Sequence, residues 1–451
     1  MTAQEPPGIG LATIQRFKRF RLVVFCILFV GYVGYYFCRV TLPVALPSLE
    51  SSFSFTKTET GLILSAFYFV YSFAKLVNGF LGDRLGGKSM LLFGIFGSAA
   101  CNLLFGFGES LVFFVTIWGF NAYFQSIGWL SMISILSHWY PSRESGRALG
   151  VMSLSYLLGD FLARSSSAAI LSQASWPALF WIHAGLLGAA GLFAFRLLRP
   201  FPHRLGLPDV RTYELYYEPG CEPAAPEAEM ESSAATSRAE YLQHLAGMLK
   251  SKAFWIVCLV CLSLSIIRYV FWGWSVQYLM DSGAGIGVAS MASAIFPLFG
   301  CLGTILAGWI SDRMGARRGP VMAVMCLLLL LSIFVFSRVP QQNSFWLSVT
   351  LGFVGFALYG PYSMLAGAIA MDFGSRYSSA SAAGIIDAVG AFGTIITGVG
   401  MGYLIDHYGW NIAFLFILSL TLLATAASFA LWNARPRHLG DAAGATRATV
   451  R

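Results

Sequence analysis

Charge is scarce along this chain. Asp, Glu, Lys and Arg make up 11% of its 451 residues, and hydrophobic residues make up 57%. A soluble domain carries about 25% charged residues, so this class of protein is excluded. Nucleophile–base motifs, metal-ligand spacings and glycine-rich phosphate loops are also missing, and we therefore expect neither an enzyme nor a cofactor. Cys258 and Cys261 stand alone in an apolar run, which favours packing thiols over a metal or redox site.

Long apolar runs take the place of charge. Each can cross a hydrocarbon core of about 30 Å as a helix. The sequence therefore predicts an all-α polytopic membrane protein with twelve transmembrane helices. The first run is too long for the apolar part of a signal peptide, and we interpret it as a retained helix. The runs cover roughly residues 22–47, 60–82, 89–107, 111–137, 148–172, 178–198, 253–280, 286–310, 320–338, 344–371, 379–404 and 411–433.

Basic residues predict how the chain is oriented. If the N-terminus is inside, the outer loops hold only Lys57 and Arg338, and most other Lys and Arg residues fall in inner loops and termini. Both termini should therefore be cytoplasmic by the positive-inside rule. The net charge of +8 is then an orientation signal in a lipid bilayer, and we expect no nucleic-acid partner.

The composition changes between the sixth and seventh runs. The segment there is rich in Pro, Ala, Ser and Glu, which is typical of a linker that is partly disordered in its middle. It divides the chain into a cytoplasmic tail (1–21), an N-terminal six-helix bundle (22–198), a cytoplasmic linker (199–252), a C-terminal six-helix bundle (253–433) and a second cytoplasmic tail (434–451).

The two halves repeat. GFLGDRLGGKS (79–89) follows the second run and GWISDRMGARR (308–318) follows the eighth, each in a short inner loop. The interval from Asp83 to Asp312 equals the interval from Arg39 to Arg268, two arginines that lie within the first and seventh runs. One offset therefore relates the loops and the intramembrane arginines. The predicted gating motif consists of Gly79, Asp83, Arg84, Gly86, Gly308, Asp312, Arg313 and Gly315.

This loop motif resembles the signature of the major facilitator superfamily. The resemblance implies two pseudo-symmetric six-helix bundles, a central site at their interface, and alternating access by a rocking movement.

Cations inside the spans point to an anionic ligand. Neither Arg39 nor Arg268 has a carboxylate within four residues. Tyr32, Tyr35 and Tyr36 share a helix face with Arg39, and Lys75 has Tyr71 four residues before it. Two guanidinium forks could clamp a phosphoryl group from opposite halves. The alternative is a buried ion pair that fixes helix packing.

Further stretches extend the resemblance over most of both halves. GYVGYYFCR (31–39), SFAKLVNGFLGDR (72–84) and RYVFWGWSVQYL (268–279) resemble motifs of the organophosphate:phosphate antiporter family. FQSIGW (124–129), LYGPYSMLAGAIAMD (358–372) and GYLIDHYGWNIAF (402–414) resemble others. This family includes bacterial glycerol-3-phosphate and hexose-phosphate transporters.

The family resemblance implies exchange of a small organic phosphate ester for inorganic phosphate, without ATP. It implies that Arg39 and Arg268 bind phosphate, with Lys75 adding positive charge nearby. The cavity-lining positions it implies are Tyr32, Tyr36, Tyr71, Trp129 and Tyr359. We expect a functional monomer in a bacterial inner membrane.

Several residues depart from the family's pattern. Val40 and Thr41 stand where Lys and Asn are common after the first arginine, and Tyr156 stands where the glycerol-3-phosphate transporters have a histidine. The chain also adds Asp160, Arg164 and Asp387.

The added charges allow two interpretations. Asp160 and Arg164 are one helical turn apart and could simply pair. Alternatively, Asp160 and Asp387, whose separation is close to the repeat offset, could face the cavity from equivalent helices and bind a substrate amine or hydroxyls, or carry a proton. Two other functions therefore stay open. One is proton-coupled symport of another organic anion, such as a phosphonate or carboxylate; the other is a non-transporting organophosphate sensor.

Overall fold

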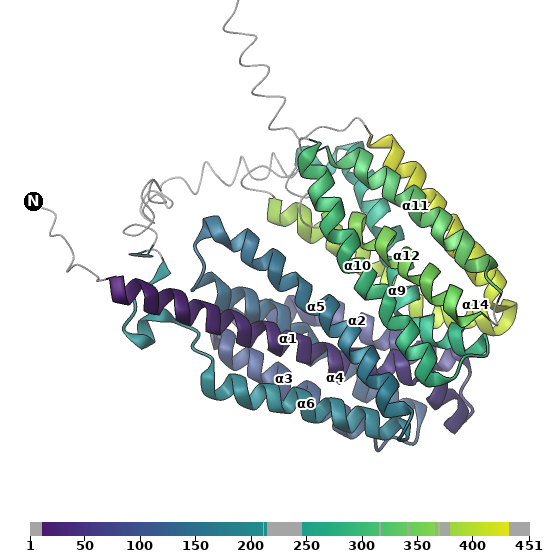
Figure 1. Cartoon of the computed structure of the whole chain (residues 1–451), viewed down its shortest axis with the longest axis horizontal. Coiled ribbons are helices and arrows are strands. Elements are labelled where there is room, and N and C mark those ends of the chain that lie inside the picture. Colours follow the sequence, from purple (N-terminus) through teal and green to yellow (C-terminus); the bar gives the residue numbers. More distant parts are fainter. Residues whose placement is uncertain are drawn as a thin grey trace, which may run out of the picture.

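A computed structural model describes residues 11–210, 212–213, 246–314, 317–340, 343–365, 369 and 379–432. These residues form helices and contain no strand (Figure 1). The helices are α1 (Leu11–Phe53), α2 (Lys57–Leu85), α3 (Gly87–Phe105), α4 (Leu111–Ser137), α5 (Ser142–Leu171), α6 (Trp176–Leu197), the short η1 (Pro202–Leu205), α9 (Lys252–Asp281), α10 (Ile286–Arg313), α11 (Arg318–Arg338), α12 (Ser344–Met364) and α14 (Ser379–Ala430).

Two successive helices make up α14. The chain bends at Gly409, where φ is 73°, a left-handed conformation that glycine adopts without a steric penalty. When α14 counts as two, the described residues contain twelve long helices, and this confirms the predicted all-α architecture.

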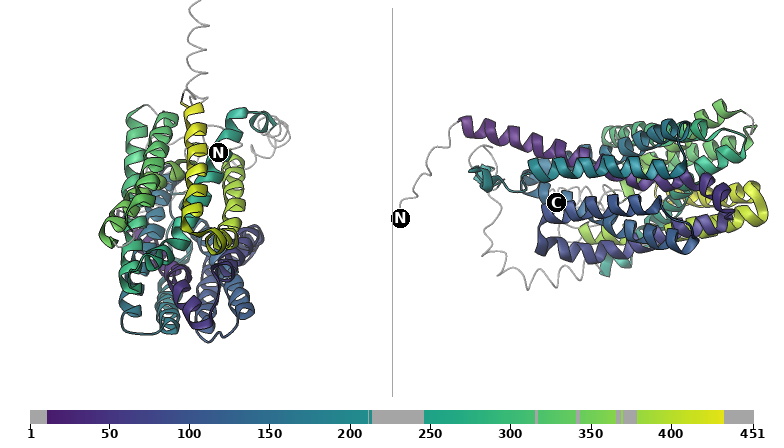
Figure 2. Two further views of the ribbon diagram at one scale, coloured as in Figure 1. Left: turned by 90° about the vertical axis from the view of Figure 1, so that its right-hand side faces the viewer. Right: turned by 90° about the horizontal axis from the view of Figure 1, so that it is seen from below.

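Helices α1, α2 and α9 extend past both ends of the apolar runs from which they were predicted, whereas α3 and α4 have the predicted length. Nine in the described residues are long and apolar enough to span a membrane, with α14 counted once. The long helices outside this set are α2 and α5, which carry several charged residues. The first helix begins at Leu11, before the predicted span, and its start projects past the other helices (Figure 2). Phe17 anchors this extension by stacking on Tyr213, with ring centroids 4.4 Å apart.

Equivalent helices pair in the two halves. In the N-terminal half α1 contacts α5 and α6, and α4 contacts α2 and α3. In the C-terminal half α12 contacts α10 and α11, and α9 contacts α14. Between the halves α2 packs on α14 and α5 packs on α10. The two sets of helices converge where α1 and α9 end and spread apart toward the start of α1 (Figure 1).

Glycine allows the closest approach inside the C-terminal half. A Cβ added at Gly303 of α10 would lie 2.0 Å from the carbonyl oxygen of Phe356, and one added at Gly355 of α12 would lie 2.1 Å from that of Phe296. Helices in membranes often use small residues in this way to bring their backbones into contact.

Gly355→Ala should therefore lower the melting temperature of the purified protein in detergent. The new methyl group would push α10 and α12 apart, and overpacking of this kind costs about 1–3 kcal/mol. Gly185→Ala on α6 is the control, because a Cβ there meets no atom of the described chain within 4 Å. Equal melting temperatures for the two variants would contradict the close helix contact.

Candidate functional site

Arg39 of α1 is enclosed by aromatic rings. Its Cζ lies 5.1, 5.5 and 4.6 Å from the ring centroids of Tyr36, Phe67 and Tyr71. Nη1 donates a hydrogen bond of 3.4 Å to the Tyr36 hydroxyl. The residue is 8% exposed, and its Nε has no hydrogen-bond partner among the described residues. Ring faces stabilise the cation but do not neutralise it.

Arg268 of α9 has an equivalent environment built from other helices. The rings of Tyr156, Tyr269, Tyr359 and Tyr362 lie 6.0, 4.9, 5.2 and 4.6 Å from its Cζ. It is also 8% exposed with an unpaired Nε, and in the described part of the chain no carboxylate forms an ion pair with either arginine. A buried charge without a counter-ion is costly, so both groups are suited to an anion.

The two aromatic shells touch each other. Tyr36 and Tyr156 have ring centroids 6.1 Å apart, and those of Tyr68 and Tyr269 are 4.9 Å apart. The first contact joins a ring beside Arg39 to a ring beside Arg268. The second joins α2 of the N-terminal half to another ring beside Arg268. Both guanidinium groups therefore lie in one continuous aromatic cluster at the interface between the halves.

A cavity of about 320 Å³ opens beside this cluster. Its lining comes from α1, α2, α9, α12 and α14, and includes Arg39, Tyr71, Lys75, Tyr269, Trp272, Tyr362 and Asp387. Arg268 does not line it in this conformation but contacts two of its lining rings, those of Tyr269 and Tyr362. The volume falls at the low end of small-molecule sites, about 300–1,000 Å³.

An ion pair crosses the cavity. Lys75 Nζ on α2 lies 3.5 Å from an oxygen of Asp387 on α14, with the side chains 36% and 54% exposed. The ammonium group also lies 5.0 Å from the Tyr71 ring centroid. Asp387 thus offsets one of the cavity's cations, a pairing that the sequence allowed but did not specify.

Asp160 does not line the cavity and pairs with Arg164, which is one of the two arrangements that the sequence left open. It is 2% exposed, and its Oδ1 accepts a 2.8 Å hydrogen bond from Nε of the fully buried Arg164. Its Oδ2 accepts a 2.9 Å bond from Nε1 of Trp272 on α9. Arg164 in turn donates to the Trp272 carbonyl at 2.7 Å and to Ser293 at 3.1 Å. Both oxygens of Asp160 therefore accept hydrogen bonds within a network that joins α5, α9 and α10.

The other predicted residues lie at different depths. Tyr36 and Tyr71 touch Arg39, and Tyr359 and Tyr156 touch Arg268. Tyr32 and Trp129 form a layer behind Tyr36, with ring centroids 5.4 Å apart. Tyr71 lines the cavity, whereas the other four positions expected there, Tyr32, Tyr36, Trp129 and Tyr359, do not.

Sequence reasoning missed Phe67, Tyr269 and Tyr362 as arginine contacts. Tyr269 follows Arg268 directly, and Tyr362 lies one helical turn after Tyr359, within a stretch already singled out.

Buried amides hold the turn of α1 that carries Arg39. Gln125 of α4 donates to the Tyr35 carbonyl at 3.0 Å, and Asn121 and Asn102 donate to that of Cys38 at 3.1 and 3.2 Å. Pro43 follows one turn later and lacks the N–H that would bond the Arg39 carbonyl. Side chains from α3 and α4 therefore position this segment.

The two residues that depart from the family's pattern directly after Arg39 pack inside the N-terminal half. Val40 and Thr41 are fully buried, and the Thr41 hydroxyl lies 3.1 Å from Nδ1 of His183 on α6. They belong to the bundle interior and do not line the cavity.

The predicted gating motif is described only in part. The side chains of Gly79, Asp83, Arg84 and Asp312, and the whole of Gly315, lie outside the described residues. Gly86 has a φ of 80°, Gly308 lies in α10, and the exposed Arg313 places its Cζ 3.9 Å from the Trp309 ring centroid.

Comparison with known sequences adds a family. Residues 28–386 and 257–449 match the sequence profile described as the Major Facilitator Superfamily. This confirms the resemblance inferred from the loop motif.

Three relatives align over most of their length. The chain is 29% identical over 429 residues to the probable hexose phosphate transport protein of Chlamydia pneumoniae, covering 94% of each. It is 29% identical over 429 residues to the glycerol-3-phosphate transporter of Bacillus subtilis, covering 93% of this chain and 94% of that one. It is 26% identical over 399 residues to the membrane sensor protein UhpC of Salmonella typhimurium, covering 88% of each.

A solved structure shares the fold. A bacterial homologue of the human lysosomal transporter Spinster, in an inward-facing and occupied conformation, superposes with a TM-score of 0.73. The match covers 91% of this chain and 96% of that one at 14% identity, so it supports the fold alone.

Asp160→Asn should destabilise the protein strongly, while Asp387→Asn should not. Removal of one partner of a buried pair leaves an uncompensated charge and costs about 3–5 kcal/mol. Asp387 is half-exposed and its pair with Lys75 is long, so its loss is expected to matter little for folding. Melting temperatures in detergent measure the difference. A larger loss for Asp387→Asn than for Asp160→Asn would contradict these placements.

Proposed function

Because the chain belongs to the major facilitator superfamily, we propose that it is a secondary active transporter that exchanges a small organic phosphate ester for inorganic phosphate. The observation that carries this proposal is the pair of buried guanidinium groups, Arg39 and Arg268, in aromatic shells with no carboxylate partner among the described residues. The ester would be of the sugar phosphate, glycerol phosphate or phosphoglycerate type.

Charge favours a phosphoryl group over a monocarboxylate. An arginine cannot lose its proton at physiological pH, so the two groups keep their charges whether or not an anion is bound. A phosphate dianion offers oxygens to both forks at once and balances both charges. Lys75 adds a third cation, and Asp387 compensates it in the absence of ligand.

Alternating access follows from the same charges. Without an anion, the two guanidinium groups resist any conformation that brings them closer together. A bound phosphate would stabilise that conformation by its differential affinity for it. Inorganic phosphate and the organic phosphate ester can each stabilise this conformation. The protein can therefore exchange one for the other without ATP. We place this multi-pass membrane protein in a bacterial inner membrane, as a monomer with both termini in the cytoplasm.

Asp387 supports a second candidate function. A carboxylate that is 54% exposed in the cavity could carry a proton, and the protein would then be a proton-coupled symporter of a phosphonate or carboxylate. Acid-driven uptake into phosphate-free vesicles that disappears in Asp387→Asn would favour this function over exchange.

The similarity to the membrane sensor protein UhpC supports a third candidate function, that of an organophosphate sensor. A sensor binds the organic phosphate without carrying it, so binding without any counterflow would identify it.

Arg39→Lys and Arg268→Lys should each reduce exchange by at least about tenfold, because an ammonium group cannot reproduce bidentate contacts that are worth about 1.5–3 kcal/mol each. The assay is counterflow in proteoliposomes loaded with labelled inorganic phosphate, tested against a panel of organic phosphates. The exposed Arg196→Lys on α6 is the matched control. Wild-type exchange rates in either site variant, at equal reconstitution, would refute the arginine clamp.

A further inference from the structure

The cavity has two chemically different sides. Arg39, Tyr71 and Lys75 line one of them with positive charge and an aromatic ring. The side formed by α14 presents the small residues Gly384 and Ala388 around the carboxylate of Asp387. A ligand whose phosphoryl group lies at the cations would therefore place its organic part against α14.

Two glycines of α14 line the cavity, and they serve different purposes. A Cβ added at Gly390 would lie 2.6 Å from Oγ of Ser265 and 3.0 Å from Sγ of Cys261, so this glycine lets α14 approach α9. Among the described residues, a Cβ added at Gly384 meets nothing within 4 Å. Packing therefore explains Gly390 but not Gly384, which leaves open space one turn from Asp387.

We propose that Gly384 determines specificity by leaving room for the organic part of the substrate, an inference that rests on the proposed function. Inorganic phosphate has no such part and does not need this space. A side chain at position 384 should therefore separate the two exchange partners.

Gly384→Ala and Gly384→Val test this in proteoliposomes, with Gly185→Val on the open face of α6 as control. Three rates are measured: self-exchange of inorganic phosphate, exchange of phosphate for glycerol phosphate, and exchange of phosphate for the bulkier hexose phosphate. We expect self-exchange within about twofold of wild type in every variant. Hexose phosphate exchange should fall at least tenfold in Gly384→Val and less in Gly384→Ala, with a smaller loss for glycerol phosphate.

Two results would overturn the assignment of Gly384. One is an equal loss of all three rates; the other is an unchanged preference in Gly384→Val. A wild-type protein without phosphate self-exchange would instead contradict the proposed function itself, and with it this inference.

A separate observation concerns the bend in the middle of α14, where the first of its two helices ends. Residues 402–409 read GYLIDHYG, with the spacing G-x-L-x-D-x-x-G found in GFLGDRLG at 79–86. Each stretch ends a long helix, and each closes on a glycine with positive φ, 80° at Gly86 and 73° at Gly409. The loop motif therefore has a third copy, at the end of the molecule where the halves converge.

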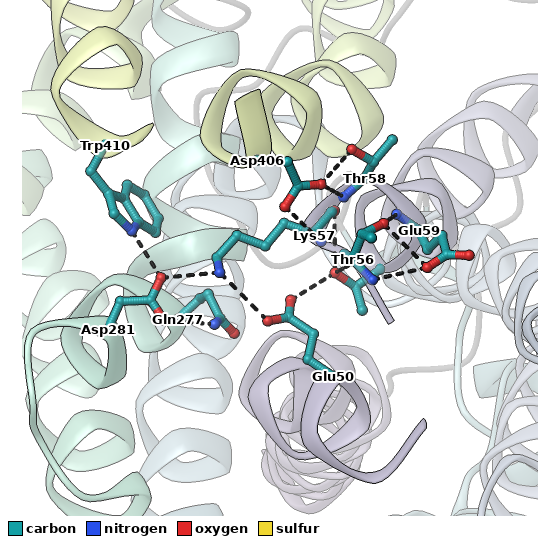
Figure 3. A network of polar contacts seen from close by, with 10 residues as sticks. Glu50, Thr56, Lys57, Thr58, Glu59, Gln277, Asp281, Asp406 and Trp410 are labelled. Carbon is teal, nitrogen blue, oxygen red and sulfur yellow. Dashed lines mark hydrogen bonds and ion pairs between the residues drawn. The ribbon is translucent and has the colours of Figure 1, made fainter. Parts of the chain in front are cut away.

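In this copy the aspartate caps a helix of the other half. Asp406 accepts hydrogen bonds from the backbone N–H of Lys57 at 3.1 Å and of Thr58 at 2.7 Å, and from the Thr58 hydroxyl at 2.6 Å (Figure 3). These groups begin α2. A carboxylate at a helix N-terminus satisfies free N–H donors and interacts favourably with the helix dipole.

Lys57 extends the contact to a third helix. Its Nζ lies 3.3 Å from Asp281 at the end of α9 and 3.8 Å from Glu50 of α1 (Figure 3). Asp281 also accepts a 2.9 Å hydrogen bond from Nε1 of Trp410, just after the bend in α14.

The backbones of α2 and α14 are also in direct contact next to Asp406. A Cβ added at Gly402 would lie 2.1 Å from the carbonyl oxygen of Lys57, and one added at Gly398 would lie 2.3 Å from that of Gly61. Among the described residues, the polar contacts between the halves lie at the cavity or on this side of it.

We infer that residues 402–409 form a latch that closes this end, predicted to face outward, and that releases α2 when the cavity opens there. This inference needs no assumption about the cargo. Separation of α2 from α14 would break the Asp406 cap and the Lys57–Asp281 pair together, and it would expose two N–H groups of α2.

Asp406→Ala tests the latch, with Glu59→Ala as the matched control. Glu59 also accepts a hydrogen bond at the start of α2, 2.9 Å from the N–H of Thr56. Because Glu59 belongs to α2 itself, its bond does not connect the two halves. Pulsed EPR between spin labels at Glu109 and Phe345, exposed on opposite halves, reports the separation. The background carries serine at the three cysteines that are not described as buried, Cys26, Cys221 and Cys301.

Asp406→Ala should raise the population of molecules with a longer distance between the labels about threefold or more. The cap exists only in the closed form, so its removal destabilises that form alone. Glu59→Ala should leave the distribution unchanged. Trp410→Phe keeps an aromatic ring but removes the indole N–H, and it should shift the distribution in the same direction as Asp406→Ala. An unchanged distribution in both Asp406→Ala and Trp410→Phe, or an equal shift in Glu59→Ala, would overturn the latch.

Discussion

The fold depends on two positive charges that cannot be removed. Arg39 and Arg268 lie in the interior of a membrane protein, where an unbalanced charge is costly. A buried carboxylate would have been the simplest remedy, as Asp160 is for Arg164. The chain instead surrounds each guanidinium group with ring faces, which lower the cost without filling the hydrogen-bonding positions. The Nε atoms of both arginines thus stay without a hydrogen-bond partner in the described part of the chain.

The repeat is symmetric in its charges and asymmetric in its surroundings. At the offset that relates Arg39 to Arg268, Tyr36 corresponds to Ser265, Tyr71 to Gly300 and Lys75 to Thr304. The C-terminal half therefore lacks equivalents of these two tyrosines and of the extra cation. Its arginine takes rings from α12 instead. Of the three smaller residues, Ser265 of α9 lines the cavity.

Sequence reasoning predicted the fold class, the repeat and the central cations, because hydropathy and a constant offset are properties of the chain alone. It did not determine the partner of Asp160. An i,i+4 spacing allows both a local pair and two separate roles, and only the packing of Trp272 against α5 decides between them. Tyr269 and Tyr362 were missed for a similar reason. Aromatic residues are common on every span, and their direction depends on how the helices rotate against each other. The cap of α2 by Asp406 joins segments from opposite halves of the chain, which no local pattern reveals.

Trp272 connects the arginine site to the contact between α9 and α5. It lies one helical turn after Arg268, about 5.4 Å along the axis of α9, and its backbone and indole are both bonded to the ion pair on α5. Any rotation of α9 that moves the arginine must therefore strain or break the bonds to Arg164 and Asp160. A single turn of α9 therefore separates Arg268 from the hydrogen bonds that join this helix to the other half.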